Sequence, residues 1–167
     1  MEKASKQLIM PNKDCIDLIM QFEGFEAKAY KCPAGVWTIG YGRTDGVKEG
    51  MTTTKDKEAA YLQSKAYEIA VEIQDKLKDV PSQGQINALT SFAYNLGIGA
   101  LTSSTLFKKH LAGDFATAQN EFTKWNKARV NGELKVLDGL TRRRKFEALM
   151  YGHLFNSRPA FCWPHFR

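Results

Sequence analysis

The spacing of apolar residues predicts a mainly helical chain that begins with a helix over residues 12–23. Asn12 is the expected N-cap, and Gly24 is the expected stop just beyond the last turn. Glu23 continues the apolar stripe, because residues three or four apart share one face of a helix. The stripe consists of Ile16, Ile19, Met20 and Glu23. The pattern therefore places a carboxyl group at the end of an inward-facing stripe.

Residues 29–43 predict a hairpin or a small sheet. The run CPAG at 32–35 fits a turn with proline in its second position and glycine in its fourth. From Val36 onward large and small side chains alternate, as they do on the two faces of a strand. The larger residues, Trp37, Ile39 and Tyr41, are expected to pack on the core. Thr38 is expected on the other face, which is small and open and leaves room for a ligand near the backbone.

The rest of the pattern is helical. Apolar residues at spacings of three and four predict a long helix over residues 53–79, which would extend roughly 40 Å and could link two lobes. Ser82 and Gln85 form a capping-box pattern in front of a largely apolar helix. The remaining predicted segments are short helices near 103–112 and 115–126, a tight turn at Asn131-Gly132, and a last helix over 138–153.

The composition is that of an ordinary soluble globular protein, with 43% apolar and 25% charged residues. A chain of 167 residues can bury a sizeable core without cross-links. The first ten residues are too polar for a signal peptide, and no apolar run reaches the roughly 18 residues of a membrane span. We expect a protein made in the cytosol, without a signal peptide or stable membrane insertion.

The positive charge is concentrated in the second part of the chain. Residues 101–167 carry 12 Lys and Arg against 5 Asp and Glu, whereas residues 1–100 carry 12 against 13. A basic half suits an acidic partner such as nucleic acid, an acidic polymer or an anionic envelope, and a solvated basic face is the plain alternative. The triplet Arg142-Arg143-Arg144 is too short for a nucleic-acid-binding arm. Cys15, Cys32 and Cys162 lack metal-binding spacing, so free thiols are expected.

Three side chains between positions 23 and 38 are candidates for chemistry. A carboxyl group held against apolar surface is favoured in its protonated form, which a general acid needs, so Glu23 is the best acid candidate. A helix-end glutamate that simply reaches water is the alternative. Cys32 adds a thiol in the turn, and Thr38 adds a hydroxyl that would also suit an ordinary strand. The three histidines share no spacing, and none is given a catalytic role.

Several motifs, in this order, resemble the phage-type lysozymes, which are the endolysins of glycoside hydrolase family 24. These motifs are Glu23-Gly24, Thr38-Ile39-Gly40-Tyr41-Gly42, Ser91-Phe92-Ala93-Tyr94-Asn95, Gly97-Ile98-Gly99-Ala100 and Gly139-Leu140-Thr141-Arg142-Arg143-Arg144. The resemblance covers roughly residues 11–153. Several motifs in the right order make it more specific than one short pattern.

The resemblance implies an α+β, mainly helical fold, lysozyme-like, in a single domain over residues 1–167. A small lobe with a sheet would occupy about 24–60, followed by the linking helix at about 53–79. A helical lobe would occupy about 80–153 together with the helix at 12–23. The cleft between the lobes would bind a glycan strand. The tail at 154–167 either wraps the body or is loose.

The resemblance also implies roles for single residues. Glu23 matches the catalytic acid, and Thr38 matches the threonine that helps to hold the water or the reacting centre. The family usually has an aspartate nine positions after the glutamate, where this chain has Cys32, as some active members do. Arg142 matches an arginine that pairs with the glutamate across the cleft. The remaining supporting or substrate-binding positions are Tyr30, Gly42 and Asn95, and Arg43 stands where a histidine is common, so altered local pairing is expected there without loss of chemistry.

The implied reaction is hydrolysis of the β-1,4 bond between N-acetylmuramic acid and N-acetylglucosamine in bacterial peptidoglycan, which causes host cell lysis. As a thiolate, Cys32 could activate water or attack the sugar. As a thiol it could do neither well, and Glu23 with a water held by Thr38 would carry the reaction. The alternatives are, in order, a lytic transglycosylase, a non-catalytic wall-binding module and a nucleic-acid binder.

The same resemblance sets the expected partners and location. No cofactor, metal or nucleic acid is expected, and the protein is expected to act as a monomer on the peptidoglycan glycan strand. It would stay in the host cytoplasm until a holin or a similar membrane pore releases it to the cell wall.

Overall fold

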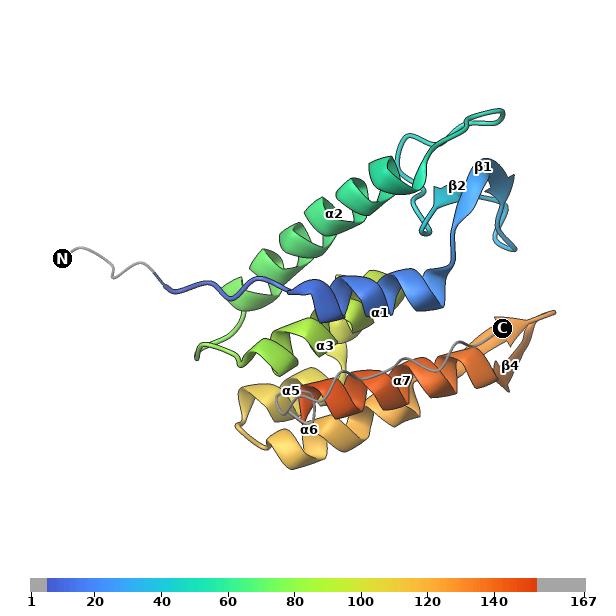
Figure 1. The fold of residues 1–167 in the computed structure, drawn as a ribbon. Helices are drawn as coiled ribbons and strands as arrows, with labels where there is room; N and C mark the ends of the chain where they lie inside the picture. Colours follow the sequence, from blue (N-terminus) through green and yellow to red (C-terminus); the bar gives the residue numbers. More distant parts are fainter. Residues whose placement is uncertain (1–5, 153–167) are drawn as a thin grey trace.

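The computed structural model describes residues 6–152 and has the predicted α+β, mainly helical fold (Figure 1). The tail at 154–167, with Cys162 and His165, and His153 lie outside the described residues. The helices are α1 (Lys13–Glu23), α2 (Lys55–Asp75), α3 (Gln83–Leu96), α4 (Ile98–Ser103), α5 (Thr105–Leu111), α6 (Phe115–Glu121), the 3-10 turn η1 (Phe122–Lys124) and α7 (Asp138–Tyr151). The strands are β1 (Glu26–Lys31), β2 (Trp37–Gly40), β3 (Lys127–Val130) and β4 (Glu133–Val136). Within residues 6–152 no helix combines the length and the apolar character needed to cross a membrane.

Helix α1 begins and ends where the sequence predicts. The side chain of Asn12 accepts a hydrogen bond from the amide of Asp14 at 3.1 Å, which caps the first turn. Gly24, with φ of +70°, donates its amide to the carbonyl of Met20 and ends the helix. The buried face of α1 packs on the helical lobe. Glu23, the last residue of α1, therefore lies at the edge of that lobe, directly before the chain enters β1.

The first sheet pairs β1 with β2 in antiparallel register, with Tyr30 opposite Thr38. The turn between them is the predicted one, because Gly35 donates its amide to the carbonyl of Cys32 at 2.8 Å. The prediction that the Thr38 face of β2 is open is wrong, because Thr38 is only 4% exposed. This face is covered at Gly40, where Glu58 of α2 lies directly against the backbone.

Arg43 and Glu58 fasten the loop after β2 to the start of α2. Two guanidinium nitrogens of Arg43 donate to the two carboxylate oxygens of Glu58, at 2.9 and 2.6 Å, and Thr53 donates a third hydrogen bond at 2.7 Å. Glu58 is almost fully buried, and the pKa of its carboxyl is held below its usual value by Arg43. This bidentate pair is the local pairing that Arg43 makes where a histidine was expected.

The linking helix α2 is shorter at both ends than the predicted range of 53–79. Thr54, rather than Thr53, caps its first turn, because the side chain of Thr54 accepts from the amide of Lys57. At the other end the ammonium group of Lys6 donates to the carbonyls of Gln74 and Leu77, both at 2.5 Å. These hydrogen bonds satisfy carbonyl groups at the end of the helix, which stops well before Pro81.

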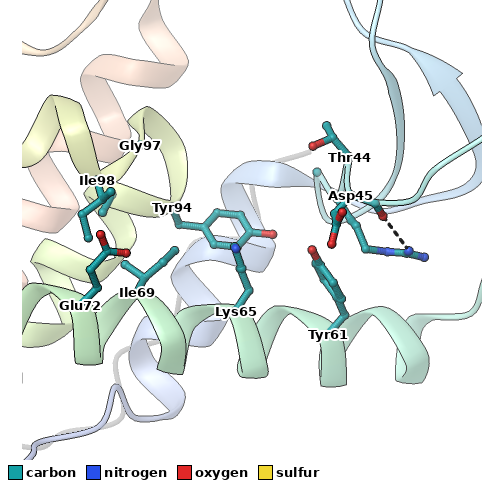
Figure 2. A pocket seen from close by; sticks show the side chains of 12 residues that line it. Thr44, Asp45, Tyr61, Lys65, Ile69, Glu72, Tyr94, Gly97 and Ile98 are labelled. Carbon is teal, nitrogen blue, oxygen red and sulfur yellow. Dashed lines mark hydrogen bonds between the residues drawn. The ribbon is translucent and has the colours of Figure 1, made fainter.

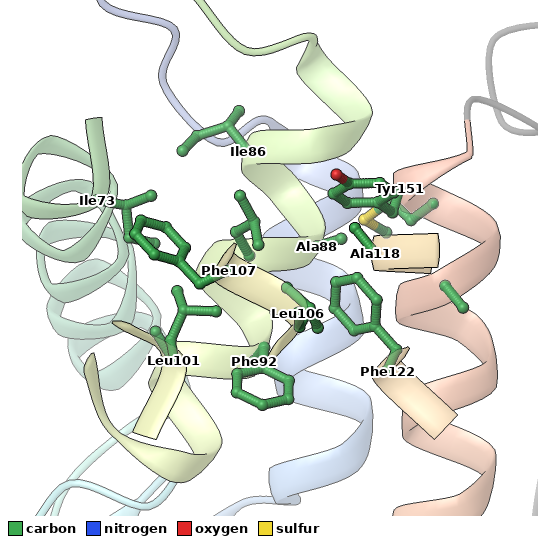
Figure 3. Packing of buried hydrophobic residues seen from close by; sticks show 14 of the residues in the cluster. Ile73, Ile86, Ala88, Phe92, Leu101, Leu106, Phe107, Ala118, Phe122 and Tyr151 are labelled. Carbon is green, nitrogen blue, oxygen red and sulfur yellow. The ribbon is translucent and has the colours of Figure 1, made fainter. Parts of the chain in front are cut away.

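Helix α3 lies at the centre of the helical lobe and is buried over most of its length (Figure 3). Its predicted capping box of Ser82 and Gln85 is present. Phe92 packs edge-on against Phe122 and Trp125, with ring centroids 5.8 and 5.4 Å apart. The core around α3 therefore holds α1, α2 and α7 at fixed positions, and these are the elements that carry the site.

The second sheet is a hairpin that the sequence revealed only at its turn. Asn131 and Gly132 form the predicted turn, both with positive φ. The flanking strands β3 and β4 lead directly into α7, with the amide of Leu137 bonded to the carbonyl of Asn126. Figure 1 shows this hairpin and the β1–β2 sheet at the same end of the molecule, on either side of the C-terminal end of α1.

Replacing Gly40 by alanine should test how tightly Glu58 closes the sheet against α2. A Cβ atom at Gly40, where φ is +60°, would lie 2.4 Å from Cγ of Glu58. Gly35 has a similar φ of +78° with no atom within 4 Å, so it is a matched control. We expect Gly40→Ala to lower the free energy of unfolding by about 3 kcal/mol, and Gly35→Ala by about 1 kcal/mol, in urea denaturation. Equal losses would show that Glu58 does not pack where the structure places it.

Candidate active site

Glu23 lies between the two lobes with one carboxylate oxygen anchored and the other beside a glycine. Its side chain is 20% exposed, and Oε1 accepts a hydrogen bond from Nη1 of Arg143 at 2.6 Å. A Cβ atom at Gly42 would lie 3.0 Å from Oε2. Glycine at position 42 therefore lets the loop after β2 approach the carboxylate closely, so the sequence motif that ends at Gly42 meets Glu23 in space.

The arginine expected to pair with Glu23 is one residue away from the predicted one. The resemblance pointed to Arg142, but Arg142 is exposed on α7 and the structure pairs Glu23 with the buried Arg143. Successive residues of an α-helix are separated by about 100° around its axis, so neighbours face different sides. A string of three arginines hides which of them faces the cleft.

One cavity is lined by Glu23, and a second is lined by its neighbour Gly42. The smaller, of about 280 Å³, is lined by Phe22, Glu23, Asn95, Leu137, Gly139, Leu140 and Arg143. The larger, of about 380 Å³, runs between the small lobe and the helical lobe (Figure 2). Gly42 lines the larger cavity while touching Glu23, and the neighbours Tyr94 and Asn95 of α3 line one cavity each. Glu23 thus lines the smaller cavity, and its Oε2 lies beside Gly42, which lines the larger one.

The walls of the larger cavity combine apolar surface with hydrogen-bonding groups. Figure 2 shows Tyr61, Lys65, Ile69 and Glu72 rising from α2, with Tyr94 and Ile98 across from them and Thr44 and Asp45 at one end. The hydroxyl of Tyr94 donates to the carbonyl of Tyr41 at 2.8 Å, which ties α3 to the small lobe. A wall of this kind suits a ligand with both apolar faces and hydroxyl groups.

Cys32 and Thr38 are neighbours at the start of the sheet. The pKa of the Cys32 thiol is lowered by the backbone amides of Val36 and Ala34, with a smaller contribution from the hydroxyl of Thr38. The hydroxyl of Thr38 also lies 3.1 Å from the carbonyl of Val36, so its one proton goes either to this carbonyl or to the sulfur of Cys32. These donors stabilise the thiolate, which is the reactive form of cysteine.

Tyr30 lies within electrostatic range of both Glu23 and Cys32. Its hydroxyl has a raised pKa, first because of burial and then because of the negative charges of Glu26, Cys32 and Glu23. Of the predicted site residues, the structure brings Glu23, Gly42 and Asn95 to the two cavities, whereas Tyr30, Cys32 and Thr38 line neither of them. Asn95 lines the smaller cavity together with Glu23, and Gly42 lines the larger one with its backbone beside Oε2 of Glu23.

Sequence reasoning missed Arg143, Arg144 and Glu147 as part of the site. Both arginines carry 3% exposure or less, and Glu147 is fully buried between them. The signal was present in the spacing, because Arg143 and Arg144 lie four and three residues before Glu147 on one helix. The sequence analysis did not use that spacing, because it assigned the pairing with Glu23 to Arg142 on the resemblance alone.

A two-lobed lysozyme-like fold with an arginine-held glutamate at its cleft defines the class of protein. The sequence profile of the phage lysozyme family, described as "Phage lysozyme", matches residues 20–147. The chain belongs to this family.

Relatives and solved structures agree with this assignment. The chain is 39% identical over 134 residues to an endolysin of Acyrthosiphon pisum secondary endosymbiont phage 1, covering 80% of this chain and 92% of that protein. It is 41% identical over 139 residues to an endolysin of Bacillus phage B103, covering 81% of this chain and 51% of that longer protein. The solved endolysin from Escherichia coli O157:H7 phage FAHEc1 is 36% identical with a TM-score of 0.77, covering 94% of this chain and 99% of that one.

Alkylation of Cys32 should report the donors around its thiol. In a Cys162→Ser background, Cys32 is half-buried and Cys15 is fully buried, so iodoacetamide should modify Cys32 selectively. Thr38→Val removes one donor to the thiolate, so it should raise the pKa of Cys32 and shift the pH dependence of alkylation upward. Thr102→Val on α4 is the control and should leave that dependence unchanged. An unshifted profile in Thr38→Val would separate Thr38 from the thiol.

Proposed function

We propose that this protein is a peptidoglycan-degrading endolysin of glycoside hydrolase family 24. It cuts the β-1,4 bond between N-acetylmuramic acid and N-acetylglucosamine and so lyses the host cell. The observation that supports this proposal best is the position of Glu23, which is anchored to Arg143 at 2.6 Å and lines a cavity of about 280 Å³, in a chain of the phage lysozyme family.

In this proposal Glu23 is the general acid. Its Oε1 is held by Arg143, so the orientation of the carboxyl group is fixed before the substrate binds. Oε2, beside Gly42, is the oxygen that carries the proton to the glycosidic oxygen as the bond breaks. Asn95 lines the same cavity and contacts the sugar next to the bond, with Tyr30 supporting the site from the sheet.

The second catalytic role falls to Cys32 with Thr38. Because backbone amides lower the pKa of Cys32, more of it is thiolate near neutral pH than in an ordinary cysteine. The thiolate acts on the face of the sugar opposite Glu23, as a base for water or as a nucleophile, and Thr38 helps to hold that water. A lytic transglycosylase would need only the acid, so the donors around Cys32 favour the hydrolase.

Glu23→Gln should abolish lysis of purified cell walls. Loss of a general acid typically lowers the rate by about 10² to 10⁴, and glutamine keeps the shape of the side chain and its contact with Arg143. Glu26→Gln is the matched control, because Glu26 is an exposed glutamate three residues further on and should retain full activity. Full lytic activity of Glu23→Gln would refute the assignment.

Mass spectrometry of the released fragments separates the remaining alternatives. A hydrolase leaves a reducing N-acetylmuramic acid end, whereas a lytic transglycosylase leaves an anhydro sugar. A wall-binding module would retain peptidoglycan without releasing fragments. Comparing wild type with Cys32→Ser and Cys32→Asp identifies the second group, since aspartate should preserve activity and serine should lower it.

The β3–β4 hairpin supplies a basic face that suits an anionic wall. In the strand register Lys127 lies opposite Val136, and Arg129 lies opposite Leu134, so these four side chains share one face. Leu134 and Val136 are 62% and 55% exposed. Leu137, the next residue after the hairpin, lines the cavity of Glu23, so this face lies close to the site. Its positive charge would attract the anionic wall to that part of the protein.

Lysis should therefore fall as ionic strength rises, because salt screens exposed charges over about 8 Å at 0.15 M. The double variant Lys127→Glu/Arg129→Glu should be slower at low salt and less dependent on salt than wild type. A control at the opposite end of the molecule, Lys76→Glu/Lys78→Glu, makes the same change in net charge. If both double variants respond alike, net charge rather than the hairpin face accounts for the effect.

Outside the wall the protein is a monomer that remains in the host cytoplasm. Its access to peptidoglycan depends on a holin or a comparable membrane pore.

A further inference from the structure

Glu147 is a fully buried carboxylate that lies behind the candidate active site. Its Oε1 accepts a hydrogen bond from Nε of Arg143 at 3.2 Å, and its Oε2 forms an ion pair with Nε of Arg144 at 3.0 Å that lacks hydrogen-bond alignment. Ser91 of α3 donates its hydroxyl to Oε1 at 2.7 Å. One buried acid thus contacts two buried bases on the same helix, in a place where a single unpaired charge would be costly.

The first arginine connects Glu147 to Glu23. Arg143 uses Nε toward Glu147, Nη2 toward the carbonyl of Ser91 at 3.2 Å, and Nη1 toward Glu23. Because the guanidinium group is planar and rigid, fixing two of its nitrogens fixes the third. The orientation of Nη1 toward Glu23 is therefore set from behind, by Glu147 and Ser91.

The second arginine connects Glu147 to Asn95. Nη2 of Arg144 donates to Oδ1 of Asn95 at 2.6 Å. An arginine can only donate, so the amide oxygen of Asn95 must face it, and the amide nitrogen is the donor that remains for the cavity shared with Glu23. The ring of Phe92 lies 4.9 Å from the Arg144 guanidinium and limits its movement.

The charges around this cluster come from two helices. Helix α7 contributes Arg143, Arg144 and Glu147, and α1 contributes Glu23. Ser91, Asn95 and Tyr94 face it from α3, and Cys15 from α1 has a raised pKa because of burial, so its thiol is neutral. Burial raises the pKa of the Glu147 carboxyl, and Arg144, Arg143 and the hydroxyl of Ser91 act in the opposite direction by favouring its ionised form.

We propose that Glu147 is a positioning residue of the active site, which aims Arg143 at the catalytic carboxyl group and, through Arg144, orients the amide of Asn95 toward the substrate. This inference rests on the proposed role of Glu23 as general acid. It assigns to one buried side chain, without contact to the substrate, control over both the proton donor and a substrate-binding group.

The test is the pH dependence of wall hydrolysis by Glu147→Gln. Removing the negative charge leaves two arginines facing Glu23, so ionised Glu23 is stabilised and loses its proton at lower pH. The basic limb of kcat/KM should move to lower pH, and kcat at neutral pH should fall by about tenfold or more. Glu121→Gln is the matched control, because Glu121 is also buried on the helical lobe and pairs with Lys124; it should keep the wild-type profile.

If the single variant does not fold, the double variant Arg144→Met/Glu147→Gln provides the test instead. It restores the balance between Arg143 and Glu23, so the basic limb should return to the wild-type position while KM rises through loss of the Asn95 contact. An activity loss equal at every pH, or a double variant with the shifted limb, would overturn the proposal. Full activity of Glu23→Gln would instead overturn the proposed function itself.

Discussion

The ion pair between Glu23 and Arg143 is the contact around which the site is built. It joins the last turn of α1 to the first turns of α7, two elements 120 residues apart in the sequence. A buried arginine is costly to desolvate unless its donors are satisfied, and here Glu147 and Ser91 satisfy them. The pair is therefore a fixed part of the helical lobe. The small lobe adds Gly42, whose backbone lies beside Glu23.

The small lobe is held to this frame by two further contacts. Arg43 and Glu58 fasten the loop after β2 to α2, and Tyr94 reaches from α3 to the backbone of Tyr41. Between these contacts lies Gly42, which approaches Glu23 more closely than a residue with a side chain could. The larger cavity is the space that these contacts leave open between the lobes.

Much of this could be predicted because the signals are local. Asn12 and Gly24 mark both ends of α1, and the spacing of Ile19 and Glu23 places the carboxyl group at its final turn. The contacts that complete the site are not local. Thr38 is only 4% exposed and Glu58 lies directly against Gly40 of the same strand, which no alternation within β2 reveals.

Other features were hidden for different physical reasons. Arg142 was chosen because the resemblance pointed to it, and in a run of three arginines only the packing of α7 shows that Arg143 is the one that faces Glu23. The strands β3 and β4 have only four residues each and mix charged with apolar side chains, so only their Asn131-Gly132 turn was recognisable. In both cases the local structure, the facing arginine in α7 and the pairing of β3 with β4, is determined by tertiary contacts and not by the local sequence pattern.

The most direct test is a crystal structure of Glu23→Gln bound to an oligosaccharide of alternating N-acetylglucosamine and N-acetylmuramic acid. The glycosidic oxygen should lie within hydrogen-bonding distance of the side chain at position 23, with the sugar chain passing between Gly42 and Asn95. Arg143 should still contact that side chain, held by Glu147. An oligosaccharide bound away from position 23, for example in the groove between α1 and α2 near Ile16 and Tyr67, would contradict the site proposed for this protein.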